Sequence, residues 1–364
     1  MFYSNPVMHT AGHATRVACC VLLLLGSPLI VSPCVASDFA VVGYLPEYRL
    51  GGFNYSAAFD TGLTHLLFFS LEIDSRGSPA ALDRLPSREQ ARAARDAADR
   101  RDGKVLVSFG GNSRSQNFGR MATTPKLRAN FISKLNGLLD EYDFDGVDYN
   151  WEYPNNDHEW HAWGDLMAES KKSLIPRGGR LRPGPSSSSA AIVTFTMYLD
   201  PQHYKIITRY DLLRDADFVH CMAYDQPHQH STMSFFQSGI DQAKRNHFPL
   251  RKFTMGLPFY ARHIRSGDPK TYAEIHGDLH NDHDDHVGEY YFNSRTLLTR
   301  KTESARHHGI GGVMIWELGQ DVQPLSRPDS LMSAVRAGLP VIRTDSKGGD
   351  SPVPTFNGAT RDDL

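Results

Sequence analysis

The sequence predicts an α/β protein, a single (β/α)8 TIM barrel without a large insertion domain. The first observation is that eight short apolar runs rich in β-branched residues alternate with segments of helical periodicity, which is typical of parallel strands joined by crossover helices. The second is length. Residues 38–345 hold all eight runs, suffice for a barrel of about 250 residues and contain no segment that resembles a second globular domain.

The predicted strands share an apolar centre and polar, glycine or proline residues at their ends. In chain order they are FAVVGYLP (39–46), HLLFFSLEI (65–73), KVLVSFGG (104–111), FDGVDYNWEYP (144–154), AIVTFTMYL (191–199), FVHCMAYD (218–225), FTMGLPFY (253–260) and GIGGVMIWEL (309–318). The segment between the last two strands does not have the pattern of an extra domain.

The clearest predicted helix is 125–142, with Thr124 as its N-cap and Pro125 in its first turn. Apolar side chains recur along it at helical spacing and are expected in the core: Leu127, Phe131, Leu135, Leu138 and Tyr142. Each further helix follows a predicted strand, as crossover connections require. These helices are expected at 87–101, 158–174, 232–246, 294–307 and 328–337.

Residues 1–37 have the pattern of a signal peptide, in which Arg16 precedes the apolar run VACCVLLLLGSPLIV and small residues surround a cleavage point near Ala36 or Ser37. An uncleaved anchor helix is the alternative, but the apolar run is shorter than the roughly 20 residues that span a bilayer. Cleavage would leave Cys221 as the only thiol. No intramolecular disulfide could then form, and Cys221 is expected to be a small buried hydrophobe.

Two further patterns belong to the secretory pathway. Asn54-Tyr55-Ser56 is an acceptor pattern for N-glycosylation and predicts a glycoprotein. Residues 346–364 have the composition of a disordered tail and end in RDDL, which resembles the KDEL-type retrieval signal in its Asp and final Leu. The sequence therefore predicts a protein that is secreted or is retained in the lumen of the endoplasmic reticulum.

The charge balance excludes two classes of partner. With 39 basic and 41 acidic residues and a formal net charge of -2, the chain has no excess charge with which to bind nucleic acid or, after signal cleavage, an anionic membrane. The segment 276–286 is rich in His and Asp, but its spacing matches no metal-ligand pattern, so a solvated loop is favoured over a metal site. We expect a monomer that needs neither metal nor cofactor.

The stretch FDGVDYNWEYP carries the chemistry. Because alternate side chains of a strand share a face, Asp148, Asn150 and Glu152 are expected to point into the barrel together. Pro154 is expected to end the strand, which places Glu152 at its carboxyl end, where barrel enzymes hold their reactive groups. Burying acids costs free energy that stability seldom justifies, so catalysis is favoured over a structural role. Neighbouring acids raise each other's pKa, which suits a general acid that cleaves a glycosidic or acetal bond.

DGVDYNWEYP, from Asp145, resembles the DxxDxDxE signature of family-18 glycoside hydrolases, the chitinase family. Four other runs resemble that family's motifs in the same order: SFGG (108–111), MAYD (222–225), LPFYAR (257–262) and GGV leading to WE (311–317). The resemblance spans about residues 39–340 and implies the same barrel that the strand count predicts.

The resemblance implies substrate-assisted hydrolysis of β-1,4-linked N-acetylglucosamine. Glu152 would protonate the leaving oxygen while the sugar's own acetamido oxygen attacks the anomeric carbon, and would then act as base toward water. Tyr224 would hold the acetamido carbonyl in line for attack, and Asp148 and Asn150 complete the implied catalytic set.

The resemblance and their positions on or at the ends of strands place four more side chains against the substrate. Trp316 would form the floor under the sugar, and Tyr44 would line the same pocket. Asp225 and Met222, which flank Tyr224, would also bind the sugar. Without an extra domain the cleft is open, so internal bonds of chitin or chitooligosaccharides are the expected target.

Asn150 stands where the family has Asp. Its carbonyl oxygen can accept the acetamido N–H, but it brings no negative charge to the oxazolinium intermediate or to Glu152. Asp148 can supply part of that charge. We therefore expect slowed hydrolysis or a shift to transglycosylation. Two alternatives stay open: an endo-β-N-acetylglucosaminidase that acts on the chitobiose core of N-glycans, and a catalytically weak lectin that binds chitin or glycans.

Overall fold

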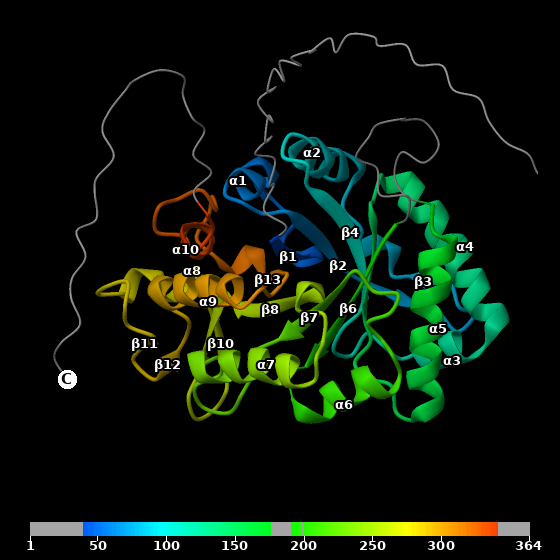
Figure 1. Ribbon diagram of the computed structural model, residues 1–364. Helices are drawn as coiled ribbons and strands as arrows, with labels where there is room; N and C mark the ends of the chain where they lie inside the picture. Colours follow the sequence, from blue (N-terminus) through cyan, green and yellow to red (C-terminus); the bar gives the residue numbers. More distant parts are fainter. Residues whose placement is uncertain (1–38, 176–190, 199, 341–364) are drawn as a thin grey trace, which may run out of the picture. The chain divides into compact units, whose positions relative to one another are not determined.

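Eight parallel strands close into a barrel in the computed structural model, which describes residues 39–175, 191–198 and 200–340 (Figure 1). β1 pairs with β2 on one side and with β13 on the other, which completes the closure and confirms the predicted fold. In chain order the barrel strands are β1 (Ala40–Pro46), β2 (His65–Ile73), β4 (Lys104–Gly110), β5 (Gly146–Asn150), β6 (Ile192–Tyr198), β7 (Phe218–Met222), β8 (Phe253–Pro258) and β13 (Gly312–Trp316).

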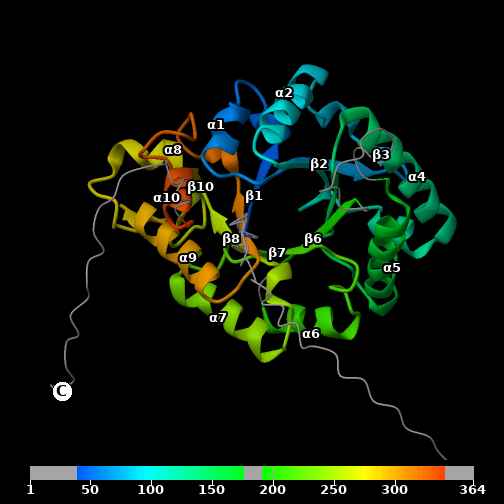
Figure 2. The same cartoon turned by 45° about the horizontal axis from the view of Figure 1, so that its top comes forward.

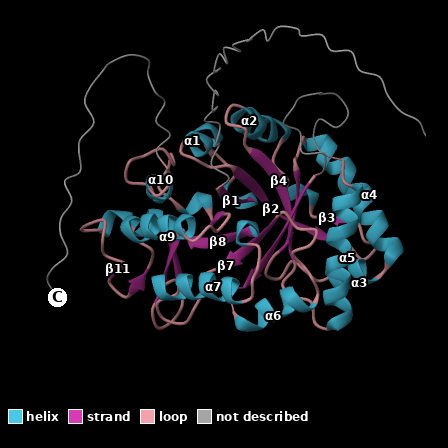
Figure 3. Cartoon of the chain, in the orientation of Figure 1, coloured by secondary structure: helices cyan, strands magenta, loops and turns pink. Residues whose placement is uncertain are grey.

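The larger helices lie outside the strands and ring the barrel (Figure 2). Colouring by secondary structure separates the two layers, with strands at the centre and helices at the periphery (Figure 3). The helices are α1 (Tyr55–Asp60), α2 (Arg88–Asp99), α3 (Phe118–Thr123), α4 (Pro125–Tyr142), α5 (Asp157–Ser173), α6 (Pro201–Arg209), α7 (Met233–Arg245), α8 (Tyr272–Ile275), α9 (Arg295–His307) and α10 (Leu331–Ala337).

The predicted helix 125–142 is α4, with the bounds that the sequence indicates. Thr124 occupies its N-cap position, but the Thr124 side chain makes no capping hydrogen bond. Four short helices were not predicted, namely α1, α3, α6 and α8. The fourth barrel strand also differs, because β5 ends at Asn150 and the segment from Trp151 to Pro154 is not strand. Glu152 therefore lies on the loop that follows the strand and not on the strand itself.

A small antiparallel sheet between β8 and α9 is a second feature that the sequence did not reveal. Its order is β10-β9-β12-β11, with bounds β9 (Tyr260–His263), β10 (Pro269–Thr271), β11 (His286–Val287) and β12 (Tyr290–Tyr291). Strands of two to four residues are too short to show an alternating pattern. The sheet is an elaboration of one barrel connection, and β9 begins two residues after β8 ends.

Two apolar layers fix which side chains face the barrel interior. Val147, Tyr149 and Trp151 belong to the outer layer between strands and helices, where Trp151 stacks on Phe118 at 5.4 Å between ring centroids. The inner layer fills the barrel and includes Tyr44 and Tyr224. Because side chains alternate along a strand, the outward positions of β5 direct its intervening residues inward.

Two predictions fall outside the described residues. These are the signal peptide (1–37) and the tail 346–364 with its RDDL ending. Within the described ranges, no helix combines the length and apolar character that crossing a membrane requires.

Candidate active site

Asp148 lies inside the barrel with no exposed surface, and the sheet register supplies its partners. Ser108 on β4 and Thr194 on β6 are its lateral neighbours. The Ser108 hydroxyl donates to Oδ2 at 2.8 Å, and the Thr194 hydroxyl donates to Oδ1 at 2.8 Å. From β1, the Tyr44 hydroxyl donates to Oδ2 at 2.9 Å and also bonds to the Thr196 hydroxyl at 2.7 Å.

These contacts set the charge of Asp148. Burial raises the pKa of its carboxyl to about 6, and the hydroxyl hydrogen bonds act in the opposite direction. The imidazole Nε2 of His220 lies 3.8 Å from Oδ1, too far for a hydrogen bond. At neutral pH Asp148 is therefore mainly ionised, held by neutral donors in the barrel.

Asn150 lies two residues further along β5 on the same face and is 4% exposed. Its side-chain carbonyl oxygen Oδ1 is buried and has no hydrogen-bond partner among the described residues. Its amide side acts as a hydrogen-bond donor toward the Glu152 carboxyl. A buried acceptor without a partner costs free energy unless a ligand or water satisfies it, so Oδ1 is an open position for a donor.

The backbone of β5 is held closely against β4 at this level. The N–H of Gly111 donates to the carbonyl oxygen of Asn150 at 2.6 Å. Gly110 has a φ of +97°, and a Cβ on it would lie 2.2 Å from that carbonyl oxygen. Gly110 in the run SFGG is thus required by the close approach of the two strand ends.

Glu152 lies at the mouth of the barrel and is partly buried. Burial raises the pKa of its carboxyl to about 7, the Asn150 amide lowers it, and the negative charge of Asp225 raises it. The sequence argument expected the acids of β5 to raise each other's pKa. That expectation was wrong in its cause, because burial and Asp225 are responsible and Asp148 makes no significant contribution. A pKa near 7 suits a group that must first give and then take a proton.

A cavity of about 340 Å³ opens above Asn150 and Glu152. It contains seven of the eight side chains that the sequence analysis selected, since Asp148 lies beneath it. The lining consists of Tyr44, Tyr48, Phe69, Asn112, Arg114, Asn150, Glu152, Thr196, Met222, Tyr224, Asp225 and Trp316. These residues come from the carboxyl ends of strands distributed around the barrel, which is where catalytic side chains of this architecture gather.

Aromatic rings form one wall of the cavity. The Trp316 ring lies 5.5 Å from that of Tyr44 and meets Phe69 edge-on at 4.8 Å. Trp316 is partly exposed, whereas Tyr44 is buried beneath it. A broad, partly exposed indole that is supported from below presents a flat apolar surface, which fits the apolar face of a pyranose ring.

Tyr224 and Asp225 form another part of the cavity lining. The Tyr224 hydroxyl faces the Met314 sulfur at 3.7 Å, a weak acceptor, so this hydroxyl remains able to donate to a ligand. Asp225 has a φ of +66° and accepts hydrogen bonds from the Tyr260 hydroxyl at 2.5 Å and from Arg262 Nε at 2.6 Å. Both donors belong to β9, so the small antiparallel sheet positions Asp225.

The sequence analysis missed several residues of the rim. Tyr48 is 62% exposed, and the residues before and after it in the turn that follows β1 each form an ion pair. Glu47 binds Arg114 at 2.7 Å, and Arg49 binds the buried carboxylate of Glu317 at 3.1 Å. Their position just after a barrel strand was the available signal, but strand ends also carry many residues with purely structural roles.

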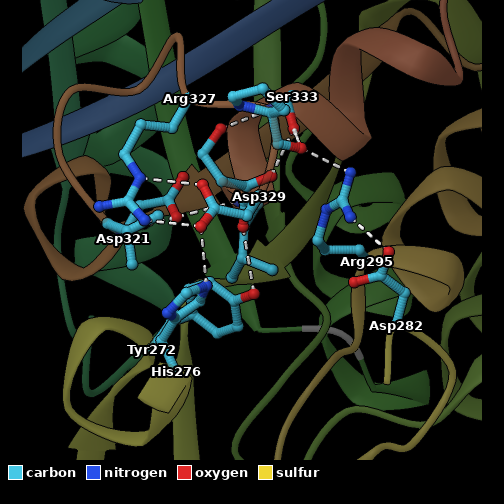
Figure 4. Close-up of polar contacts among 12 residues, drawn as sticks. Tyr272, His276, Asp282, Arg295, Asp321, Arg327, Asp329 and Ser333 are labelled. Carbon is cyan, nitrogen blue, oxygen red and sulfur yellow. Dashed lines mark hydrogen bonds and ion pairs between the residues drawn. The ribbon is translucent and has the colours of Figure 1, made fainter. Parts of the chain in front are cut away.

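Residues of the His- and Asp-rich segment 276–286 make contacts with other parts of the protein. His276 Nε2 lies 3.2 Å from a carboxylate oxygen of Asp329, which Arg327 also binds (Figure 4). Asp282 pairs with Arg295 in the same network (Figure 4). Across the described ranges, no group of three or more His, Cys, Asp or Glu side chains is arranged to hold a metal ion. This network ties the antiparallel sheet to α9 and to the segment before α10.

Comparison with known proteins agrees with this geometry. Residues 40–321 match the family described as Glycosyl hydrolases family 18. A class V chitinase of Medicago truncatula is 26% identical over 190 residues, which cover 48% of each chain. The first curated relatives are matched over 48% to 64% of their own length, so the chain spans about half to two thirds of them.

Solved structures share the fold at low sequence identity. A chitinase from the chitin utilization locus of Flavobacterium johnsoniae has a TM-score of 0.66 at 22% identity, covering 82% of this chain and 93% of that chain. A chitinase-like agglutinin of Robinia pseudoacacia has a TM-score of 0.64 at 19% identity, covering 82% and 99%. The same fold therefore occurs in a chitinase and in an agglutinin.

Proposed function

Because the chain belongs to family 18 of the glycosyl hydrolases, we propose that it cleaves internal β-1,4 bonds between N-acetylglucosamine units of chitin or chitooligosaccharides. The observation that carries this proposal is the pairing at the end of β5. Glu152 has a carboxyl pKa of about 7 at the cavity mouth, and beside it Asn150 presents a buried carbonyl oxygen to which no described residue bonds. One group transfers a proton, and the other awaits a donor on the substrate.

In the first step the protonated Glu152 gives its proton to the glycosidic oxygen. The acetamido oxygen of the sugar attacks the anomeric carbon as the glycosidic bond breaks, which forms an oxazolinium ion and releases the leaving-group sugar. The Tyr224 hydroxyl donates to the acetamido oxygen, and Asn150 Oδ1 accepts the acetamido N–H. Holding the internal nucleophile in line supplies a large part of the rate enhancement.

In the second step water opens the oxazolinium ion. The Glu152 carboxylate takes a proton from the water as the water oxygen bonds to the anomeric carbon, and the bond to the acetamido oxygen breaks. Two displacements at the same carbon retain its configuration. Trp316 supports the sugar from below throughout, so the ring stays positioned between the steps.

The missing charge at Asn150 affects both steps. A unit charge about 4 Å from the developing cation, at an effective dielectric of about 20, would contribute roughly 4 kcal/mol. Asp148, two residues before Asn150 on the same face of β5, is ionised and supplies part of this stabilisation. However, its oxygens already accept hydrogen bonds from three hydroxyl groups. We therefore propose slow hydrolysis, with transfer to a second sugar competing with water.

Two other functions use the same cavity. An endo-β-N-acetylglucosaminidase would cleave the chitobiose core of N-glycans by the same steps. A lectin would bind without cleavage. We keep this candidate because a chitinase-like agglutinin of Robinia pseudoacacia has the same fold. Hydrolysis is favoured over binding because a carboxyl with a pKa near 7 between Asn150 and Asp225 has no use in binding alone.

The predicted signal peptide and glycosylation site lead to a proposal about location. We propose that residues 1–37 direct the protein into the secretory pathway and are then removed, and that Asn54 is glycosylated. Asn54 is exposed and caps α1, with Oδ1 accepting from the Ala57 N–H at 2.9 Å. A mass loss on treatment with a glycan-releasing amidase, present in the native chain and absent in Asn54→Gln, would support glycosylation, and identical masses would refute it.

The test of the enzymatic proposal is a product analysis. The native protein and Glu152→Gln are incubated with chitohexaose and, separately, with a high-mannose glycoprotein, and the products are identified by mass spectrometry. Shorter chitooligosaccharides made only by the native protein support the chitinase proposal, longer ones reveal transfer, and released glycans favour the endoglycosidase. Binding without any product would favour the lectin.

A further inference from the structure

His203 lies on the side of the barrel mouth that faces the aromatic wall of Trp316. In the closed sheet β6 is four strands away from β1, so the residues that follow β5 and β6 lie across the cavity from Tyr44 and Trp316. Glu152 stands between the two sides. If one sugar rests on Trp316, the sugar beyond the cleaved bond must lie over the loops that follow β5 and β6.

This second side has its own aromatic surface. Tyr153 follows Glu152 directly and is 37% exposed. Its ring lies 5.4 Å from the imidazole of His203, and Tyr198, at the end of β6, meets the same imidazole at 6.5 Å. The His203 side chain keeps 17% of its surface exposed between these rings. An imidazole therefore lies at the edge of a partly exposed aromatic platform, and Tyr153 connects this platform to Glu152 along the chain.

Asp200 fixes which nitrogen of His203 is available. Oδ2 of Asp200 lies 2.8 Å from His203 Nδ1, and a carboxylate only accepts hydrogen bonds, so Nδ1 carries the proton. In the neutral ring His203 Nε2 is then an acceptor, and no described residue forms a hydrogen bond to it. The arrangement aims one unpaired acceptor away from the Asp200 carboxylate.

Capping of α6 does not explain the imidazole. Oδ1 of Asp200 accepts from the backbone N–H groups of Gln202 at 2.8 Å and His203 at 2.9 Å, which completes the cap without any side chain at position 203. The hydrogen bond between His203 Nδ1 and Asp200 Oδ2 is therefore not needed for the cap, and its effect is to orient the imidazole ring. A ring that is oriented but has a free acceptor is suited to binding a donor.

We propose that His203 is a specificity-determining residue for the sugar that leaves Glu152 or returns to it. Its Nε2 accepts a hydrogen bond from a ring hydroxyl of an N-acetylglucosamine unit, and the apolar face of that unit rests on Tyr153. The inference rests on the proposed glycosidase function and extends it to the leaving-group side of the cleaved bond, where it favours transfer to a sugar over hydrolysis.

The transfer step balances without a proton on His203. The acceptor hydroxyl oxygen bonds to the anomeric carbon of the oxazolinium ion as the bond from that carbon to the acetamido oxygen breaks. The hydroxyl proton passes to the Glu152 carboxylate. His203 holds the acceptor through a different hydroxyl, so it acts by positioning the sugar.

The experiment uses the oxazoline of chitobiose as donor, which carries no leaving group, and chitobiose as acceptor. The products of water attack and of sugar transfer are measured by mass spectrometry for the native protein, His203→Phe and His203→Gln. Phe keeps the ring contacts with Tyr153 and Tyr198 but has no acceptor. Gln restores an acceptor near the position of Nε2.

His161→Phe is the matched control, because His161 also contacts a tyrosine ring, Tyr210 at 4.8 Å, but on the outside of α5. We expect the ratio of transfer to hydrolysis to fall about fivefold in His203→Phe, the factor of one neutral hydrogen bond. The ratio should recover in His203→Gln and stay unchanged in His161→Phe.

An unchanged ratio in His203→Phe, with the native protein active, would overturn the inference about His203 and leave the proposed function intact. Failure of His203→Gln to recover the ratio would also overturn it, because the loss would then come from packing. A native protein that consumes neither the oxazoline nor chitohexaose would instead refute the proposed function and the inference together.

Discussion

Asp148 and Asn150 lie two residues apart on the same face of β5, yet their side chains are treated in opposite ways. Both oxygens of Asp148 are bonded to hydroxyls of the barrel. The carbonyl oxygen of Asn150 is buried, and no residue in the described ranges forms a hydrogen bond to it. The contrast teaches that the lower position is completed by the protein itself, whereas the upper one keeps an acceptor that the proposed substrate would use. The predictions below break or sharpen that contrast, from the largest expected effect to the smallest.

Glu152→Gln should abolish cleavage of chitooligosaccharides, with a loss of at least about thousandfold in kcat, because the amide can neither give nor take the proton at the glycosidic oxygen. The measurement is the initial rate of chitohexaose cleavage, followed by mass spectrometry. Binding of the substrate, measured by calorimetry, should persist. Cleavage that survives this substitution would remove Glu152 from the mechanism.

Asp148→Asn should slow cleavage by about a hundredfold, because it removes the remaining negative charge on this face of β5. It also replaces one of the two acceptor oxygens by an NH2 group, which cannot accept a hydrogen bond from the surrounding hydroxyls. Ser108→Ala is the matched control, since it removes one hydrogen bond but keeps the charge, and it should cost only about tenfold. Equal losses in the two variants would mean that Asp148 acts through its hydrogen bonds and not through its charge.

The pH dependence of the native protein follows from the Glu152 carboxyl. Its pKa is about 7, above the ordinary value, so the proton needed by the leaving oxygen is present below that pH and is lost as the pH rises through it. We expect kcat/KM for chitohexaose to fall about tenfold per pH unit above 7. A profile that stays level to pH 9 would mean that another group donates the proton.

The same carboxyl carries a stability cost. Its pKa is about 7 in the folded protein and about 4.3 in an unfolded chain, so the folded state binds the proton more tightly and loses stability as the pH rises between these values. Glu152→Gln removes this cost. Relative to the native protein it should gain about 3 kcal/mol in free energy of unfolding between pH 4 and pH 8, measured by urea titration. An equal difference at both pH values would contradict the burial of Glu152.

The barrel was predictable because each strand is an apolar run of its own and α4 repeats its apolar side chains over five turns. The same patterns could not reveal the sheet of β9 to β12, whose strands have two to four residues. That gap had a consequence for the site, because Tyr260 and Arg262 orient Asp225 from β9. The run LPFYAR and Asp225 were both recognised in the sequence, but the hydrogen bonds between them were not predicted.

The candidate site shows the same division. Alternation along the strand predicts that Asp148 and Asn150 share a face, and the structure places them so. Which of the two is bonded depends on Ser108, Thr194 and Tyr44, hydroxyl residues that in sequence are ordinary members of β-strands. The hydrogen bonds of Asp148 depend on how β5 is aligned with the strands that carry the three hydroxyl groups, namely β1, β4 and β6. A single sequence does not reveal that alignment.

The most direct test of the contrast between Asp148 and Asn150 is the pH profile of chitohexaose cleavage by Asn150→Asp beside the native protein. The substitution restores a charge at the upper position and removes the amide donor that lowers the pKa of Glu152. We predict a rate about tenfold higher at pH 6 and a basic limb moved to higher pH. A lower rate with an unmoved limb would show that the site is built around the amide and does not lack a charge.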